Sequence, residues 1–213
     1  MDKHKPTQIL PEEYSEIAKF DLDDHPGLAM ILNLVGIGVL FGVAWLLMES
    51  LVLLRPEYLA TENILIITGM REFWRNVLIL VVSLGLMIIL NEGGRWLMYW
   101  AITHQRPKIG FKGFYTYAAA PEWYLPKWAY LLIRLAPTTG ITLFGLAVVP
   151  LVPLNLIPGV LLLVSLNLAS ATSDLYIVYW LSRVPKDILI RDYGDGVRVY
   201  HNDHQPLEVS VQP

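Results

Sequence analysis

Glu92 and Arg95 are two ionisable residues inside a long apolar stretch of the sequence. A charged side chain at the centre of a bilayer costs about 2.5 to 3.5 kcal/mol on insertion scales. Such residues therefore face a protein interior or a watery cavity, usually beside a partner of opposite charge. We expect residues 90–96 to form part of a polar site within the membrane.

The spacing around these charges is that of a zincin helix. On an α-helix, residues 91 and 95 share one face, and residue 92 is turned away from it by about 100°. In zincins, two histidines at such positions bind zinc, and the glutamate after the first histidine activates water. This chain has Asn91 and Arg95 at the histidine positions and Glu92 at the position of the general base. Zinc sites use Cys, His and carboxylate ligands, and a guanidinium cannot ligate a metal. The spacing is therefore present without its two histidine ligands.

Later apolar stretches carry further charges at a similar depth. With a rise of 1.5 Å per residue, residues 91–95 lie about 12 to 18 Å from the end of their span, and Asp174 lies about 10 Å from the end of the last span. Arg134 lies a little over one turn into the span between them. We therefore predict one polar layer, in which Arg95 can pair with Asp174 and Glu92 with Arg134.

Composition places the protein in the membrane class. Of its 213 residues, 54% are hydrophobic and 16% are charged, against about 45–50% and about 25% in soluble domains. The net charge of −3 and the lack of a basic stripe with interleaved aromatic residues argue against nucleic-acid binding. The chain has no cysteine, which excludes disulfides, thiolate catalysis and thiolate-bound metal sites. We predict an α-helical integral membrane protein that is embedded in the lipid bilayer.

Four apolar runs are long enough to cross a bilayer, which takes about 20 residues. An acidic leader of residues 1–27 precedes the predicted membrane domain of residues 28–182, and a tail of residues 183–213 follows it. The four transmembrane helices are predicted at residues 28–48, 77–103, 129–149 and 156–181.

The remaining segments carry more local predictions. The apolar residues of the leader have the spacing of a short amphipathic helix, and residues 137–140 should break the third span. Residues 108–118 contain two short extended segments. Residues 188–190 and 197–200 should form a hairpin through an Asp-Gly turn. Residues 57–75 form an external connection without an assigned function, in which residues 63–69 either form a strand or lie against the bilayer.

The distribution of Lys and Arg predicts the orientation in the membrane. The leader, the second connection and the tail together carry eleven of these residues, against three in the first connection and none in the third. By the positive-inside rule, both termini lie in the cytoplasm. The same count suggests a bacterial inner membrane or its equivalent.

From residue 83 to residue 200, the chain resembles a family of small membrane proteins described as putative zincin peptidases, which are similar in plan to site-two-type intramembrane metalloproteases. The resemblance depends on the order and spacing of several stretches rather than on any one of them. These stretches are residues 106–111 and 114–118, Leu135-Ala136-Pro137, residues 167–175 with Asn167, Ser170 and Asp174, residues 183–187, and residues 192–196.

The resemblance implies that Glu92 stands at the general base and Asp174 at the third metal ligand, and its matching stretch includes Asn167 and Ser170. Together with Arg134 from the polar layer, Asn167 and Ser170 are the expected supporting polar residues. In the family, two histidines complete the zinc site. Because Asn91 and Arg95 replace them, we expect no cofactor. We expect a salt bridge from Arg95 to Asp174 to take the structural place of the metal. The first interpretation is thus a pseudo-peptidase that binds or regulates a membrane partner, with residues 108–118 as a candidate surface for a peptide or membrane protein.

Two alternatives stay open. Glu92 and Asp174 could hold zinc with water and Asn91, or act as an acid and base without it, in an active membrane protease. A transporter-like component with a charged cavity is the other alternative, although four spans and the lack of inverted repeats argue against it. The extended segments at 108–118 could bind a peptide by β-augmentation or could simply pack against the domain.

Overall fold

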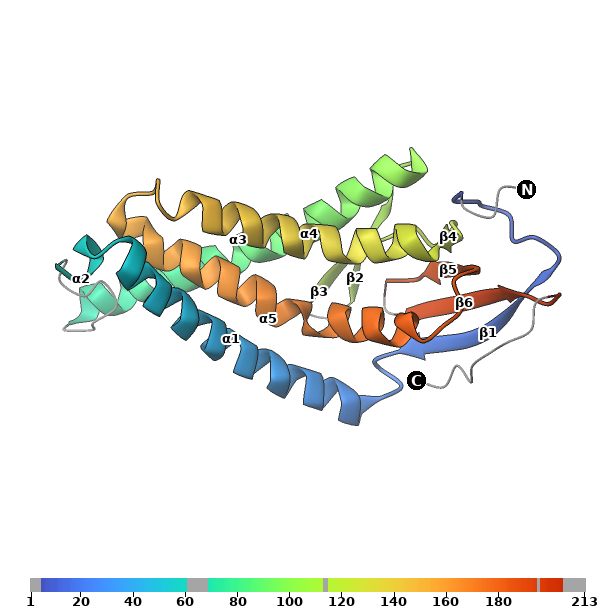
Figure 1. Cartoon of the computed structure of the whole chain (residues 1–213), viewed down its shortest axis with the longest axis horizontal. Helices are drawn as coiled ribbons and strands as arrows, with labels where there is room; N and C mark the ends of the chain where they lie inside the picture. Colours follow the sequence, from blue (N-terminus) through green and yellow to red (C-terminus); the bar gives the residue numbers. More distant parts are fainter. Residues whose placement is uncertain (1–4, 61–68, 113–114, 195, 205–213) are drawn as a thin grey trace. The chain divides into compact units, whose positions relative to one another are not determined.

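The computed structural model describes residues 5–60, 69–112, 115–194 and 196–204 (Figure 1). Four of its helices are long and apolar enough to cross a membrane. The prediction of an α-helical membrane protein with four transmembrane helices is therefore confirmed. These helices are α1 (Pro26–Leu54), α3 (Met70–Thr103), α4 (Lys127–Val148) and α5 (Ile157–Ser182), the last preceded by the 3-10 turn η1 (Leu154–Leu156).

The chain forms two compact units, and each long helix contributes to both of them. Unit 1 contains residues 1–32, 92–137 and 173–213, and unit 2 contains residues 33–91 and 138–172. The predicted division into leader, membrane domain and tail concerns sides of the membrane. The units instead group residues by their contacts, so that the leader and the tail belong to the same unit.

Unit 1 contains a four-stranded antiparallel sheet in the order β1-β6-β5-β4 (Figure 1). The predicted C-terminal hairpin is confirmed as β5 and β6, although Asp195 in its turn lies outside the described residues. The four strands are β1 (Tyr14–Asp21), β4 (Leu125–Pro126), β5 (Ile188–Asp192) and β6 (Gly196–Asn202).

The leader helix expected from apolar spacing is wrong. Residues 14–21 form strand β1, which pairs with β6 from Tyr14 opposite Asn202 to Asp21 opposite Gly196. A register shift between Glu16 and Ala18 inserts one extra residue. Such a bulge breaks the alternation of a strand, which is why the apolar spacing of this segment resembled that of a helix.

The extended segments after α3 are confirmed as an antiparallel pair, with Lys108 opposite Ala119. Strands β2 (Lys108–Lys112) and β3 (Tyr115–Ala119) form a two-stranded sheet of their own. Gly113 and Phe114, which the sequence placed between and within these segments, lie outside the described residues.

The core of unit 1 joins the sheet to the adjoining ends of the helices. Its buried apolar side chains come from α3, α4 and α5 and from every strand of the four-stranded sheet. Phe20 on β1, for example, packs with its ring centroid 5.3 Å from that of Trp180 on α5. Any charge that these helix ends carry inward must therefore be paired inside a tightly packed interior. Among the largest fully buried members are Phe20, Tyr99, Leu125, Tyr130, Ile133, Leu181, Ile190 and Val199.

Helix α4 is continuous, and the predicted break at residues 137–140 is wrong. Pro137 lies inside the helix. Proline lacks an N–H and removes one helical hydrogen bond, but transmembrane helices tolerate it because neighbouring groups satisfy the freed carbonyl. Proline content alone therefore did not predict an end of this helix.

In unit 2, α1 continues to Leu54 and α3 already begins at Met70, so both helices extend beyond the predicted spans. Directly after α1, Arg55 donates from Nη1 to the carbonyl oxygens of Val149, Pro150 and Val152 at 3.2 to 3.3 Å. These contacts attach the end of α1 to the connection between α4 and α5. Residues 61–68, and with them most of the predicted segment 63–69, lie outside the described part of the chain.

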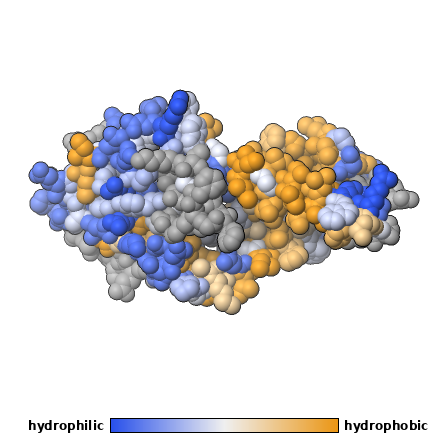
Figure 2. Space-filling model, turned by 180° about the vertical axis from the view of Figure 1, so that it is seen from behind, coloured by the Kyte–Doolittle hydropathy of each residue, from blue (hydrophilic) through white to orange (hydrophobic). Residues whose placement is uncertain are grey.

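The surface of unit 2 is largely apolar, as a lipid-facing surface requires. Large side chains such as Phe41 and Trp45 on α1 are exposed by 70% and 64%. In the most apolar 18-residue stretch of α1, 6% of the residues are buried, and in the corresponding stretch of α3, 11% are buried. The space-filling view shows this surface as a continuous apolar area (Figure 2). These helices are thus built to face hydrocarbon.

Candidate functional site

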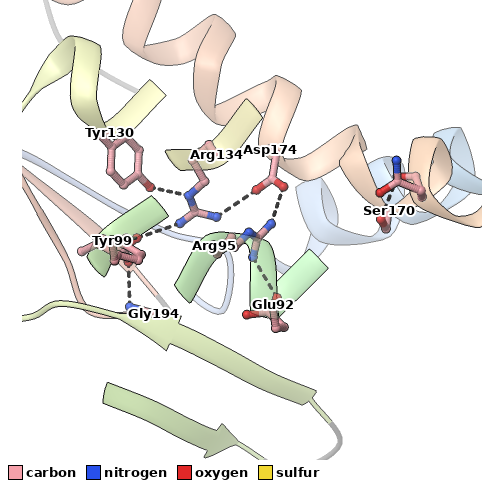
Figure 3. A network of polar contacts seen from close by, with 10 residues as sticks. Glu92, Arg95, Tyr99, Tyr130, Arg134, Ser170, Asp174 and Gly194 are labelled. Carbon is pink, nitrogen blue, oxygen red and sulfur yellow. Dashed lines mark hydrogen bonds and ion pairs between the residues drawn. The ribbon is translucent and has the colours of Figure 1, made fainter. Parts of the chain in front are cut away.

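The predicted pair between Arg95 on α3 and Asp174 on α5 is present in unit 1. Arg95 donates from Nη2 to Oδ2 of Asp174. Its Nη1 donates to Oε1 of Glu92 at 3.1 Å, one turn earlier on the same helix. Arg95 therefore joins the residue at the general-base position to the residue at the third-ligand position (Figure 3).

A second guanidinium, that of Arg134 on α4, reaches the same carboxylate. Its Nη1 donates to Oδ1 of Asp174 at 2.9 Å and its Nη2 to Oδ2 of Asp192 at 3.4 Å. Its Nε donates to the hydroxyl of Tyr130 at 2.8 Å. Both oxygens of Asp174 are thus bonded to guanidinium groups (Figure 3). The predicted pairing of Glu92 with Arg134 stays a prediction.

Asp192 extends the network from the helices to the sheet. It ends β5, and its Oδ2 accepts a hydrogen bond from the hydroxyl of Tyr99 at 2.5 Å. Its Oδ1 accepts the backbone N–H of Gly194 at 2.7 Å. Gly194 has a φ of 88°, a conformation that glycine adopts readily because it has no Cβ. The turn after β5 therefore holds the carboxylate that Arg134 needs.

Tyr99, Tyr130 and Asp192 were not predicted from the sequence. Helical spacing could have found the two tyrosines, because Tyr99 follows Arg95 by four residues and Tyr130 precedes Arg134 by four. Asp192 lies in the stretch 192–196 that contributes to the family resemblance, but no helical spacing relates it to the charged residues of the spans.

The network, which we define as Glu92, Arg95, Arg134, Asp174 and Asp192, is deeply buried. The exposed fraction of the Asp174 side chain is 2% and that of Arg134 is 11%. Arg95 and Glu92 are exposed by 17% and 22%. Buried ions are tolerated when their geometry and hydrogen bonds compensate the loss of water. The network satisfies this condition at Asp174, whereas Nε of Arg95 is buried without a partner among the described residues.

Gly94 allows α3 and α4 to approach closely beside the network. A Cβ at this position would lie 2.9 Å from Cβ of Pro137. At the neighbouring Gly93, nothing lies within 4 Å of such an atom. Gly94 therefore has a packing role that Gly93 lacks, and it lies directly before Arg95.

The other predicted site residues belong to unit 2 and make separate contacts. Asn91 is buried, and its Oδ1 has no hydrogen-bond partner in the described part of the chain. Asn167 donates from Nδ2 to the carbonyl oxygen of Thr138 at 2.9 Å and to Oγ1 of Thr142 at 3.0 Å. Ser170 donates to the carbonyl oxygen of Asn167 at 2.8 Å. The supporting role of Asn167 and Ser170 stays a prediction.

The sequence around this network is similar to that of a known family. Residues 84–189 match the family described as Putative zincin peptidase. These residues make up just under half of the chain, and over them the chain is similar to this family. The match lies within residues 83–200, the stretch over which the sequence resembles the family, and confirms that prediction. Searches of curated proteins and of solved structures found no match.

The residues at the zincin positions do not fit a zinc ion. Arg95 stands where the second histidine of the motif would stand, and its guanidinium is bonded to the carboxylate at the third-ligand position. An arginine keeps its positive charge and offers no lone pair to a metal. Among the residues that the structure describes, no three His, Cys, Asp or Glu side chains are grouped to hold a metal ion. The site of this chain is thus built from ion pairs.

Proposed function

We propose that this membrane protein is a pseudo-peptidase, which binds or regulates a membrane partner without hydrolysing it. The supporting observation is the bond from Arg95 to Asp174, since it uses the third-ligand carboxylate for an ion pair. General-base catalysis of the zincin kind needs a metal-bound water beside the glutamate. Here Glu92 is paired with the arginine instead.

The salt bridge provides a physical replacement for the metal. A zinc ion would balance the carboxylates gathered at this depth. In this chain Arg95 and Arg134 supply two positive charges, which face the negative charges of Glu92, Asp174 and Asp192. Charge-assisted hydrogen bonds of this kind are among the strongest in proteins. The frame of a hydrolase can therefore stay folded without its metal.

Strands β2 and β3 are the proposed partner surface, covering residues 108–118. Their two-stranded sheet is separate from the four-stranded one, and each strand has one strand partner among the described residues. A strand edge of this kind can accept an extended peptide by β-augmentation. The partner is accordingly an extended segment of a membrane protein or a peptide.

The orientation follows from the charges of the connections. Eleven Lys and Arg residues lie in the leader, the second connection and the tail, against three in the first connection. The positive-inside rule then places both termini in the cytoplasm of a cell with an inner membrane or its equivalent. The β2–β3 hairpin lies on the same side and would meet a cytoplasmic segment of its partner.

Zinc content provides the test, measured by elemental analysis on the full chain purified in mild detergent. We expect far less than one zinc per chain in the wild type. The double variant Asn91→His/Arg95→His should bind about one zinc per chain, because it completes the two-histidine, one-carboxylate set. Adding Asp174→Asn should abolish that binding, whereas adding Glu92→Gln should retain it, because the motif glutamate is a base and not a ligand.

The opposite results would support the enzyme. A stoichiometric zinc in the wild type that is lost on Asp174→Ala or Glu92→Ala would contradict the proposal. Cleavage of a membrane-protein substrate by the wild type, lost on Glu92→Ala, would contradict it as well.

A further inference from the structure

Unit 2 contains an apolar groove between α3 and the beginning of α5, and none of its lining residues belongs to the zincin motif. Its volume is about 360 Å³, within the range of small-ligand pockets. One wall consists of Leu78, Val82 and Leu86, which follow one another at intervals of one helical turn. The facing wall consists of Leu156, Gly159 and Leu163.

The floor of this groove presents a polar group that already has its hydrogen-bond partner within the protein. Ser83, which is 4% exposed, donates its hydroxyl hydrogen to the carbonyl oxygen of Gly159 at 3.1 Å. The hydroxyl is thereby satisfied within the protein. A Cβ at Gly159 would lie 3.7 Å from Oγ of Ser83 and 3.8 Å from Cγ2 of Ile79, so α5 packs against α3 at the floor. The remaining contacts that the floor and walls can offer a guest are apolar.

One end of the groove is polar. Asn155 lines it and lies in η1, directly before α5 begins. A polar residue at the end of a transmembrane helix lies near the depth of the lipid headgroups. At the other end, Leu86 and Leu163 lie farther into their helices. The groove therefore runs from a polar entrance into an apolar interior.

The walls are open toward the surrounding hydrocarbon. Leu78, Val82 and Leu86 are exposed by 63%, 48% and 46%. Both walls belong to helices that can cross a membrane, so a guest reaches them from the bilayer. An unfilled groove leaves its lining atoms without van der Waals partners, and bilayer hydrocarbon supplies these partners.

The groove is elongated along α3. From Leu78 to Leu86 the groove extends about 12 Å along α3. Its polar entrance and apolar interior match, in this order, the ester end and the hydrocarbon of a lipid that lies along the helices. We propose that the groove binds one acyl chain of a bilayer phospholipid, with the ester and headgroup end at Asn155.

Photo-crosslinking in phosphatidylcholine vesicles tests this assignment. The full-length protein is reconstituted with phosphatidylcholine that carries a diazirine either at the beginning or in the middle of one acyl chain. After irradiation, the labelled residues are mapped by mass spectrometry. The first probe should label Asn155 and Leu156, and the second should label Leu86 and Leu163. Each probe should label its own pair of residues more strongly than it labels lipid-exposed Phe41 of α1.

Filling the groove should remove this excess. Gly159→Leu adds a side chain whose Cβ is in van der Waals contact with Ser83 and Ile79 and whose outer methyl groups extend into the groove, and labelling of the groove should fall to the level of Phe41. Gly38→Leu on α1 is the matched control, because nothing lies within 4 Å of a Cβ there, and it should leave groove labelling unchanged. Val82→Trp fills the groove from the opposite wall and serves if Gly159→Leu does not fold.

Three outcomes would overturn the proposal. The first is labelling of the groove at the same level as Phe41, which would indicate ordinary annular lipid. The second is unchanged labelling in both filled variants. The third is labelling by a diazirine fatty acid with none by the phospholipid probes, which would assign the groove to a free acid.

Discussion

Helix α5 carries two buried polar residues two turns apart, Asn167 in unit 2 and Asp174 in unit 1, and their polar contacts differ in kind. Asn167 is fully buried and donates neutral hydrogen bonds to Thr138 and Thr142 on α4, whereas its Oδ1 has no partner among the described residues. Asp174 is 2% exposed and is held by two guanidiniums. The same helix therefore uses an uncharged contact in one unit and an ionic network in the other.

The difference lies in what remains when one partner is removed. Deleting a neutral partner leaves a dipole without a hydrogen bond, which costs about 1–3 kcal/mol. Deleting one partner of a buried ion pair leaves an uncompensated charge, which costs about 3–5 kcal/mol. Along α5, losing a partner should therefore cost less stability at Asn167 than at Asp174. The ionic region contains three of the four zincin positions, namely Glu92, Arg95 and Asp174.

The largest effect is expected for Arg134→Met. This change leaves Asp192 without its guanidinium partner and Asp174 with one guanidinium, that of Arg95. The free energy of unfolding in detergent micelles should fall by about 3–5 kcal/mol. Chemical denaturation followed by tryptophan fluorescence measures it. Arg134→Lys keeps the charge but not the three-way donation, so its loss should be smaller. Equal losses for both variants would show that shape, and not charge, matters here.

The next effect separates two adjacent glycines on α3. Gly94→Ala brings a Cβ to 2.9 Å from Cβ of Pro137, and the rigid ring cannot rotate away. We expect a loss of about 1–3 kcal/mol from overpacking. Gly93→Ala meets nothing within 4 Å and should instead stabilise the helix by about 0.5–1 kcal/mol. Denaturation midpoints of the two variants give the comparison. The same sign for both would contradict the close approach of α3 and α4.

The membrane helices could be predicted from the sequence because their information is local. A run of about 20 apolar residues is sufficient to indicate a span, and the Arg95–Asp174 pair followed from counting depth along two such runs. The ends of the helices were harder to predict, because polar residues such as Glu49 and Ser50 continue α1 beyond its apolar run. Helix propensity and hydropathy thus describe different lengths of the same element.

Strand β1 and Asp192 could not be predicted in the same way. Strand β1 owes its conformation to β6, whose paired residues lie nearly the whole chain away in sequence. Asp192 enters the network because β5 ends beside Tyr99 and Arg134, a placement that no local spacing encodes. Long-range strand pairing therefore decided the part of the site that sequence reasoning missed. It also connects the zincin positions to the sheet through one chain of bonds.

The smallest effect is expected in the neutral region, for Asn167→Ala. The change removes two hydrogen bonds, at 2.9 and 3.0 Å, each worth about 1 kcal/mol. The change leaves the carbonyl oxygen of Thr138 and Oγ1 of Thr142 without this donor, so the loss should be about 1–2 kcal/mol. Asn33→Ala on the exposed face of α1 is the matched control and should change the free energy of unfolding by less than about 0.5 kcal/mol. A loss at Asn167 as large as that of Arg134→Met would mean that the neutral cluster is as indispensable as the ionic one. The contrast between the two regions of α5 would then be one of chemistry without an energetic consequence.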